Sequence, residues 1–429
     1  MPRPQQNPET SFKLTPPAAT TVAAFFLTIV LCFAATQSAH AQSYQVLYSF
    51  SGGPDGAYPE TGLTTDSTGD LFGTTYYGGL TGGYCGPAGC GTVFEVGPTP
   101  DGWSFSEIWA FDPSGSGGAS PSSRLILRSD REFSLYGATT SGLYYDGAAF
   151  RLTDTGSGDW IETVLWQFGS ALSQFADLTF DASDNLYGTI ASDGTYGPCR
   201  DYNCGSVYRL SSVNGTQSQF NEAGISKFLD LSGDGWWPES GVTFDQAGNL
   251  YGTTSEGGQY GAGTVYKLTP SGDYWTQTVL YSFNSPNDGG APYAGIVVDA
   301  SGNLYGATSS GGPQGGGTVF MLSPSGGGYT FTVLHVLAGG LSVLRDLGID
   351  TAGNLYGATY TGGAYGHGNI FKLTHSSGGW TYASLHDFSG GNDGDGPICT
   401  PILDANGNVY GTTHNGGAYG YGTVWEITP

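Results

Sequence analysis

The sequence predicts an all-β protein, a seven-bladed β-propeller built from four-stranded antiparallel blades. Three observations support it: a sevenfold internal repeat, four candidate strands in each repeat, and complementary strands at the two ends of the array. The last repeat stops after its third strand, and a lone strand of the fourth type, Tyr44 to Phe50, precedes the first repeat. Pairing this strand with the last blade would close the ring and leave no open sheet edge there.

Two sequence columns define the repeat. Leu-Tyr-Gly or a close variant recurs at intervals of 51 to 64 residues, with an aspartate six residues before its aromatic residue. The glycines of this motif are Gly73, Gly137, Gly188, Gly252, Gly306, Gly357 and Gly411, and the aspartates are Asp66, Asp130, Asp181, Asp245, Asp299, Asp350 and Asp404. A Gly-Thr-Val-Phe motif follows each at Gly91, Gly147, Gly205, Gly263, Gly317, Gly368 and Gly422. Both columns therefore count seven units.

The fourth unit illustrates the strand prediction. Runs rich in β-branched and aromatic residues, bounded by turn residues, cover Gly241 to Phe244, Asn249 to Thr254, Gly263 to Leu268 and Trp275 to Phe283. Asp245 opens the first turn, where its carboxylate can accept backbone hydrogen bonds. Because such an aspartate recurs in every unit, we interpret the column as structural rather than catalytic.

The N-terminus and the charge restrict the class of protein. Residues 1–41 are typical of a secretory signal peptide, and residues 42–429 then form a single seven-repeat domain. No second long apolar stretch follows, so we expect no membrane span. Without the signal peptide the chain keeps 10 basic and 35 acidic residues. This excess of acid argues against nucleic acid as a partner, because phosphate binding needs a basic surface.

The repeat resembles a known family. Units four to six carry the pattern Asp-x-x-Gly-Asn-Leu-Tyr-Gly, then Gly-Gly, then Gly-Thr-Val-Phe most completely. This pattern is similar to the tandem repeats of exported bacterial GloVer-repeat proteins. The resemblance implies a propeller-like repeat fold, but it implies no particular activity. Unit two departs most, with Asp130-Arg131-Glu132-Phe133-Ser134 in place of the usual turn.

Five cysteines follow the signal peptide. Cys85 with Cys90, and Cys199 with Cys204, lie in the two longest loops between second and third strands. An exported protein meets an oxidising compartment, so we predict one local disulfide in each loop. A zinc site built from both pairs is the alternative, but neither loop contains histidine. Cys399 lies in an apolar first strand, which favours a buried and unreactive thiol.

The loops between second and third strands and the blade crossovers share one face of the ring. Candidate ligand-binding residues on this loop face are Tyr76, Tyr77, Tyr144, Tyr145, Trp236, Trp237, Asp393 and Asp395. Flat aromatic rings beside carboxylates are typical of sugar binding, although such rings can also pack between blades. Irregular loops on a rigid scaffold favour this face as the functional one.

The sequence predicts no catalytic residues, metal site or cofactor. It contains no nucleophile elbow, zinc-protease helix, phosphate loop or haem attachment motif. The acidic run Asn392 to Gly396 suggests calcium only weakly, because it lacks the twelve-residue loop and final glutamate of a calcium hand. His367 and His414 lie in or near the loops between second and third strands as isolated acid–base candidates.

The hypothesis that best fits these features is a secreted, non-enzymatic binding propeller that recognises an extracellular polysaccharide or a cell-surface partner. A carbohydrate-active hydrolase or lyase with a carboxylate pair near the central channel is the first alternative. A structural repeat protein of the cell envelope is the second.

Overall fold

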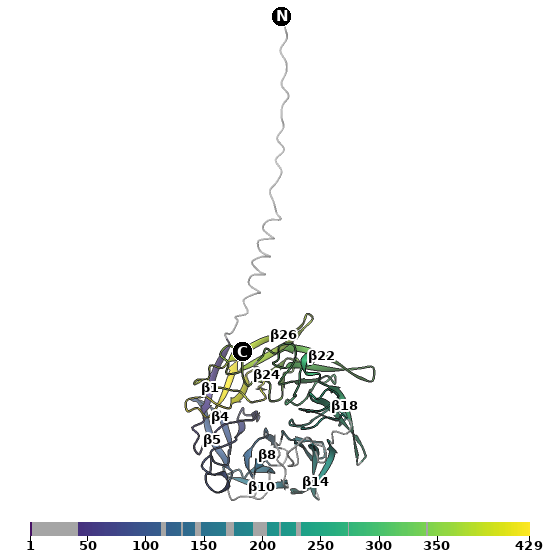
Figure 1. The fold of residues 1–429 in the computed structure, drawn as a ribbon. Helices are drawn as coiled ribbons and strands as arrows, with labels where there is room; N and C mark the ends of the chain where they lie inside the picture. Colours follow the sequence, from purple (N-terminus) through teal and green to yellow (C-terminus); the bar gives the residue numbers. More distant parts are fainter. Residues whose placement is uncertain are drawn as a thin grey trace. The chain divides into compact units, whose positions relative to one another are not determined.

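Seven antiparallel sheets form the ring of a β-propeller (Figure 1). The computed structural model describes Met1 and residues 42–112, 117–129, 132–141, 147–168, 176–191, 204–213, 216–228, 233–272, 274–339 and 342–429. Ser43–Thr428 make up one compact unit. Within each sheet, strands that are consecutive in the sequence lie next to each other, apart from the strands at the edges of blades 2 and 7, which agrees with the predicted blade topology.

The strands of the first three blades follow the repeat. Blade 1 holds β2 (Thr64–Thr65), β3 (Leu71–Thr75), β4 (Thr92–Thr99) and β5 (Gly102–Ala110). Blade 2 holds β6 (Ala119–Pro121), β7 (Ile126–Arg128), β8 (Ser134–Ser141), β9 (Ala148–Asp154) and β10 (Trp160–Gln167). Blade 3 holds β11 (Thr179–Phe180), β12 (Leu186–Ile190), β13 (Ser206–Val213) and β14 (Thr216–Lys227).

The remaining blades have the same order. Blade 4 holds β15 (Thr243–Phe244), β16 (Leu250–Thr254), β17 (Thr264–Ser271) and β18 (Tyr274–Ser282), and blade 5 holds β19 (Val297–Val298), β20 (Leu304–Ala307), β21 (Thr318–Ser325) and β22 (Gly328–Val336). Blade 6 holds β23 (Gly348–Ile349), β24 (Leu355–Thr359), β25 (Asn369–Ser376) and β26 (Gly379–Asp387). In the described part of the chain, two short helices lie in loops, η1 (Gly83–Cys85) and α2 (Ser285–Asp288).

Blade 7 is completed by the start of the chain, as the sequence predicts. It holds β27 (Ile402–Leu403), β28 (Val409–Thr413) and β29 (Thr423–Thr428), and β1 (Ser43–Ser49) pairs antiparallel with β29. In Figure 1 the purple β1 lies beside the yellow end of the chain. The ring is therefore closed between first and last repeats.

Blade 2 differs from the four-stranded expectation. Both β6 and β7 pair with β8, so its sheet has five strands. In blades 1 and 4 the crossover makes the equivalent contact as a single bridge, Ala57 with Tyr77 and Trp236 with Glu256. The extra strand is thus a longer version of a contact that other blades also make.

Close packing explains the glycine of the Leu-Tyr-Gly motif. A Cβ atom on Gly73 would lie 2.5 Å from the Phe94 ring, and one on Gly357 would lie 2.3 Å from Phe371. The aromatic residue of the Gly-Thr-Val-Phe motif fills this space and is fully buried in blades 1 and 6. The two motifs recur together because each strand pair needs both residues to pack.

Candidate functional site

The segment that enters each innermost strand brings its blade nearest to the ring axis. Five of these segments carry charged side chains that interact electrostatically with one another. They are Glu60 in blade 1, Arg124 in blade 2, Asp177 in blade 3, Glu239 in blade 4, and Arg345 with Asp346 in blade 6. The axis of the propeller is therefore lined by an acidic network that contains two arginines.

Two aspartates of this network tie neighbouring blades together. Asp177 Oδ1 accepts the backbone N–H of Arg124 at 2.7 Å, and Asp346 Oδ1 accepts that of Gly295 at 2.6 Å. Burial raises the pKa of Asp346, and the charge of Asp177 raises it further. The repeated geometry gives both side chains a structural role at the blade boundary.

Glu60 and Glu239 occupy the same repeat position in blades 1 and 4. Each ends an aromatic-Pro-Glu sequence, and Arg345 interacts electrostatically with both. The Arg345 Nε donates a hydrogen bond to the backbone oxygen of Glu60 at 3.1 Å. Burial raises the pKa of Glu60 and raises that of Glu239 to about 7, because desolvation disfavours the charged form. Burial therefore opposes ionisation of both carboxyl groups.

The aromatic residue of each sequence has an unfavourable backbone conformation. Tyr58 has φ 57° and Trp237 has φ 60°, whereas blade 7 places Gly396 at the equivalent position with φ 61°. A left-handed conformation costs a residue with a side chain about 1–2 kcal/mol. Blades 1 and 4 therefore carry a large ring where glycine would fit with less strain.

Around Glu60 the side chains form an aromatic group. The ring of Tyr58 lies 5.0 Å from that of His414 and 6.1 Å from that of Tyr77. The His414 Nδ1 lies 3.6 Å from Glu60 Oε1, and burial lowers the pKa of His414. Tyr77 is exposed, and Tyr76 packs edge-on against it at 4.8 Å. In such an arrangement the carboxyl group can form hydrogen bonds with a sugar, and the exposed rings can stack against it.

Around Glu239 a second carboxylate takes the place of Tyr77. The Trp236 Nε1 donates to Glu256 Oε2 at 3.1 Å, and the two backbones pair through hydrogen bonds of 2.9 and 3.2 Å. Tyr293 from the next crossover is exposed, and its pKa is raised by burial of its hydroxyl and by the charges of Glu239 and Glu256. Trp237 is half-buried beside them.

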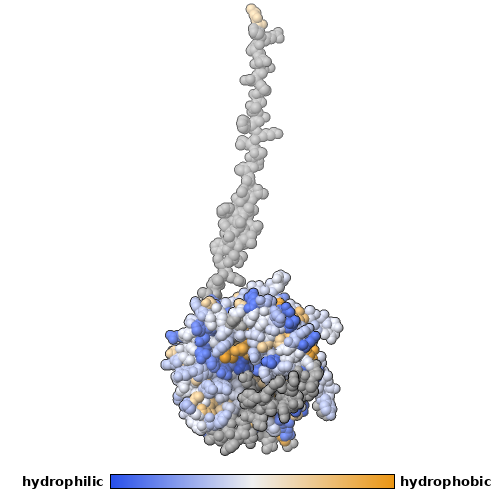
Figure 2. Space-filling model, viewed as in Figure 1, coloured by the Kyte–Doolittle hydropathy of each residue, from blue (hydrophilic) through white to orange (hydrophobic). Residues whose placement is uncertain are grey.

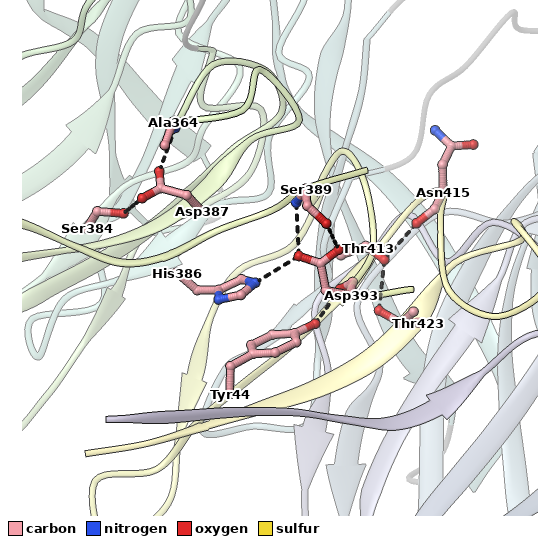
Figure 3. Close-up of polar contacts among 10 residues, drawn as sticks. All are labelled: Tyr44, Ala364, Ser384, His386, Asp387, Ser389, Asp393, Thr413, Asn415 and Thr423. Carbon is pink, nitrogen blue, oxygen red and sulfur yellow. Dashed lines mark hydrogen bonds and ion pairs between the residues drawn. The ribbon is translucent and has the colours of Figure 1, made fainter. Parts of the chain in front are cut away.

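Asp393 is engaged within its own turn (Figure 3). Its carboxylate accepts hydrogen bonds from the Ser389 backbone N–H at 2.9 Å and hydroxyl at 2.5 Å, and lies 3.3 Å from His386 Nε2. Tyr44 stacks on His386 with ring centroids 3.7 Å apart and donates to the Asp393 backbone oxygen. Asp55 holds the equivalent turn through Ser51 and Tyr48. This position is a repeated turn.

The other candidates from the sequence are distributed around the loop face. Asp395 Oδ1 lies 3.0 Å from the Nδ1 of His367. Tyr144 and Tyr145 lie outside the described residues. The structure therefore brings Tyr76 and Tyr77 together beside Glu60, and Trp236 and Trp237 beside Glu239, but it places Asp393 and Asp395 in a different blade crossover.

Exposed aromatic residues gather on the loop face. Within the described residues and apart from Met1, ten large apolar side chains are exposed, and eight of them lie on crossovers or on loops between second and third strands. These eight are Tyr77, Leu80, Tyr84, Tyr260, Tyr293, Tyr365, Tyr419 and Tyr421, and the other two are Ile161 and Tyr274. In the view of Figure 2 the described surface has only small, separate hydrophobic patches.

The hairpin aspartates act on the opposite face. Asp245 Oδ1 accepts the backbone N–H groups of Ala247 and Asn249, and its Oδ2 accepts the Asn249 amide and the Tyr251 hydroxyl. Asp181, Asp299, Asp350 and Asp404 make the same contacts. The column is structural in these five blades, and Asp130 lies outside the described part of the chain.

The cysteines bear on the stability of the loops. Cys85 and Cys90 form the predicted disulfide. Cys204 is buried and disulfide-bonded, but Cys199 lies outside the described residues, so that pairing stays a prediction. Cys399 is a buried free thiol, and burial raises its pKa to about 12.

Two absences concern the described residues alone. They contain no group of three or more histidine, cysteine, aspartate or glutamate side chains placed to hold a metal ion. No helix among them has the length and apolar character needed to cross a membrane.

Comparison with known proteins identifies the repeat. The family model of the Gloeobacter/Verrucomicrobia repeat matches residues 176–425, which is more than half of the chain. The chain belongs to this repeat family. No curated protein matches the sequence. The match to the family model confirms the resemblance that the repeat pattern indicated.

Solved structures share the propeller fold at low identity. A Bacteroides uniformis protein assigned as a 6-phosphogluconolactonase has a TM-score of 0.51 and 12% identity, over 76% of this Gloeobacter/Verrucomicrobia repeat protein and 84% of its own chain. The extracellular domain of a protein assigned as a one-component system from B. thetaiotaomicron has a TM-score of 0.53 and 10% identity, over 89% of this chain. That match covers only 39% of the B. thetaiotaomicron chain. Both likenesses concern the fold alone.

None of the sequence motifs points to the axial residues Glu60, Glu239 and Arg345. A signal for the other charged residues of the network exists in the repeat itself. The position before the first apolar strand residue is glycine in units one, four and five, but Arg124, Asp177 and Asp346 in units two, three and six. Aligning the seven units column by column and marking the charged departures in this column would have found Arg124, Asp177 and Asp346.

Proposed function

We propose that this protein is an exported glycan-binding module that binds its ligand on the tyrosine-rich loop face. The observation that carries the proposal is the concentration there of eight of the ten exposed large apolar side chains in the described part of the chain. Exposed tyrosines offer a flat ring for stacking and a hydroxyl for hydrogen bonding, and they lose little conformational entropy on binding.

Three of these tyrosines recur at one repeat position. Tyr260, Tyr365 and Tyr419 each stand in a Gly-Gly-x-Tyr-Gly loop, with exposed fractions of 56%, 65% and 64%. Tyr419 borders a groove of about 640 Å³ that is also lined by Tyr48, Ser51 and Asp55. Equivalent rings on several blades would contact a long polysaccharide at several points, and the linked contacts would raise its apparent affinity.

Export is part of the proposal. Residues 1–41 have the sequence of a signal peptide, and the Cys85–Cys90 disulfide suits an oxidising compartment. The formal charge of −24 favours neutral over acidic polysaccharides, because like charges repel.

The test is a glycan-array screen of the protein, followed by affinity measurements on each hit for the triple variant Tyr260→Ala, Tyr365→Ala and Tyr419→Ala. We expect at least a tenfold loss of affinity for long chains, about 1.4 kcal/mol. Tyr274→Ala is the matched control, because Tyr274 is 80% exposed but starts β18 on the opposite face. Unchanged binding by the triple variant would place the site elsewhere.

The structural alternative makes a different prediction. An envelope component would self-associate as its concentration rises, whereas a glycan-binding module of this kind stays in one oligomeric state. Analytical ultracentrifugation over a hundredfold concentration range separates the two.

A further inference from the structure

We propose that Glu239 and Glu256 are the acid and base of a glycoside-hydrolysing site at the inner edge of the loop face. This inference rests on the proposed glycan binding, because the substrate would be a glycan held by that face. It assigns to the protein a reaction that binding alone does not require.

The first support is geometric. Glu239 lies in the crossover that enters β15, and Glu256 follows the end of β16. The Trp236 backbone pairs with that of Glu256, the Ser255 N–H donates to the Trp237 oxygen at 2.9 Å, and the Trp236 indole holds the Glu256 carboxylate. The segments that carry Glu239 and Glu256 are therefore held next to each other by backbone hydrogen bonds, and the two carboxyl groups interact electrostatically.

The second support is an unmet need for hydrogen bonds. Glu239 Oε2 and Ser255 Oγ are buried, and neither has a hydrogen-bond partner of acceptable geometry. The Ser255 side chain is only 1% exposed, and its hydroxyl lies close enough to the Glu239 carboxyl to influence its pKa. Buried polar atoms normally have well-aligned partners, whereas these two have only a poorly aligned contact with each other, so a polar ligand would improve their hydrogen bonding.

The third support is the contrast between the two carboxyl groups. Burial raises the pKa of Glu239 to about 7; Ser255 and Arg345 oppose the rise and the charge of Glu256 adds to it. Glu256 is exposed and accepts the Trp236 indole N–H. Tyr293 from the next crossover also interacts electrostatically with both carboxyl groups. Neighbouring carboxyl groups in unlike environments are suited to act as acid and base.

The proposed step is hydrolysis by direct attack of water. Glu239 gives its proton to the bridging oxygen of the glycosidic bond as the bond between that oxygen and the anomeric carbon breaks. Glu256 takes a proton from the water whose oxygen bonds to the anomeric carbon. The products are two sugar chains with hydroxyl ends, and proton exchange with solvent returns both carboxyl groups to their starting states.

The substrate class follows from the surroundings. Tyr293 and Trp237 supply rings for stacking a sugar, and the axial network places Glu60, Asp177 and Asp346 nearby. Acid outnumbers arginine in this network, so a neutral hexose polymer fits better than a uronic acid polymer. Tyr77 occupies in blade 1 the position that Glu256 occupies in blade 4. Of these two equivalent sites, only the one in blade 4 therefore has two glutamates.

Glu162, a second glutamate with a raised pKa, provides the control variant for the experiment. Burial also raises the pKa of Glu162 to about 7, but this residue lies on β10, the outermost strand of blade 2. Glu162→Gln removes a carboxyl group of the same pKa without touching the proposed site. It therefore separates loss of chemistry from general effects of removing a buried acid.

The experiment measures sugar release from neutral polysaccharides and from neutral aryl hexosides by the wild type, Glu239→Gln, Glu256→Gln and Glu162→Gln. We expect turnover by the wild type and by Glu162→Gln, and at least a hundredfold loss in each of the other two variants. Wild-type turnover should fall as the pH rises through about 7, the pKa of Glu239, because the acid must be protonated. Circular dichroism and glycan affinity confirm that each variant is folded and still binds.

Each outcome decides the proposal. Glycan binding without sugar release from any substrate overturns the hydrolytic site and leaves the binding proposal standing. Release that survives in Glu239→Gln or Glu256→Gln overturns the assignment of these residues. Failure to bind any glycan, together with no release from aryl hexosides, overturns both proposals.

Discussion

The same repeat builds both faces of the propeller, but its residues recur more regularly from blade to blade on the hairpin face, opposite the loop face, than on the loop face. On the hairpin face, Asp245 and its equivalents make one set of four hydrogen bonds in five blades. On the loop face, the equivalent crossover position holds Tyr58, Ser120, Trp237, Ala291 or Gly396 in different blades. Repetition of a contact indicates a structural role, and departure from the repeat at a shared position points to function.

The strongest test of the repeated part concerns the ring junction. Phe50 and Phe283 are fully buried at the same repeat position, and their rings lie 5.1 Å from Phe94 and Phe320 at the same interplanar angle of 63°. Phe50 comes from the chain start, whereas Phe283 lies within the array. We expect Phe50→Ala and Phe283→Ala each to lower the free energy of unfolding by about 3–5 kcal/mol. Urea denaturation measures both.

The comparison between these two variants is the informative quantity. Equal losses indicate that the closure between β1 and β29 packs like any other blade boundary. A much smaller loss for Phe50→Ala would contradict this, because a junction that opens in solution would already expose the ring.

A smaller effect is expected from the hairpin network. Asp350→Ala removes the acceptor for the N–H groups of Ala352 and Asn354, the Asn354 amide and the Tyr356 hydroxyl. Hydrogen bonds to a charged group contribute about 1.5–3 kcal/mol, and exposure of this turn favours the lower end for the set. We expect a loss of about 2 kcal/mol in thermal or urea unfolding at neutral pH, and about 0.5 kcal/mol or less for the exposed control Asp101→Ala.

This effect should depend on pH. Burial acts to raise the pKa of Asp350, but the hydrogen bonds from Asn354, Tyr356 and Ala352 outweigh it, so the pKa lies below its usual value. The stabilisation is therefore present above the usual aspartate pKa and is lost as the pH falls through the lower, folded-state pKa. A difference between wild type and Asp350→Ala that persists in strong acid would contradict the electrostatic explanation.

The sequence predicts the repeated part of the molecule well. Periodic residues such as Gly252, Asp245 and the Phe of Gly-Thr-Val-Phe establish the blade count and the strand order, because each residue has the same packing task in every unit. The predicted closure by Tyr44 to Phe50 agrees with β1 (Ser43–Ser49) and its pairing with β29.

The axial site is harder to predict, because it joins residues that are distant in sequence. Arg345 contacts the backbone of Glu60 across 285 positions, a proximity that only ring closure creates. Composition and local motifs contain no information on which crossovers face one another across the axis. The role of Asp393 in its own turn was likewise not predictable from the sequence, because its carboxylate accepts a hydrogen bond from Ser389 in the folded crossover.

The smallest predicted effect concerns Glu239, and its measurement tests whether this buried carboxyl group in blade 4 lowers the stability of the protein. The folded-state pKa of Glu239, about 7, is above its usual value because of burial, so the folded protein binds a proton more tightly than the unfolded chain. Stability is then lost as the pH rises from the usual glutamate pKa to about 7, and Glu239→Gln removes this loss because glutamine does not ionise. We expect the variant to match wild type near the usual glutamate pKa and to be more stable by about 1 kcal/mol at alkaline pH, after discounting for partial exposure. Urea denaturation across this range measures the difference, and Glu162→Gln should behave alike if burial alone is the cause. No gain at alkaline pH would mean that Arg345 compensates the charge of Glu239 fully, and the residue would then be a structural ion-pair partner at the axis.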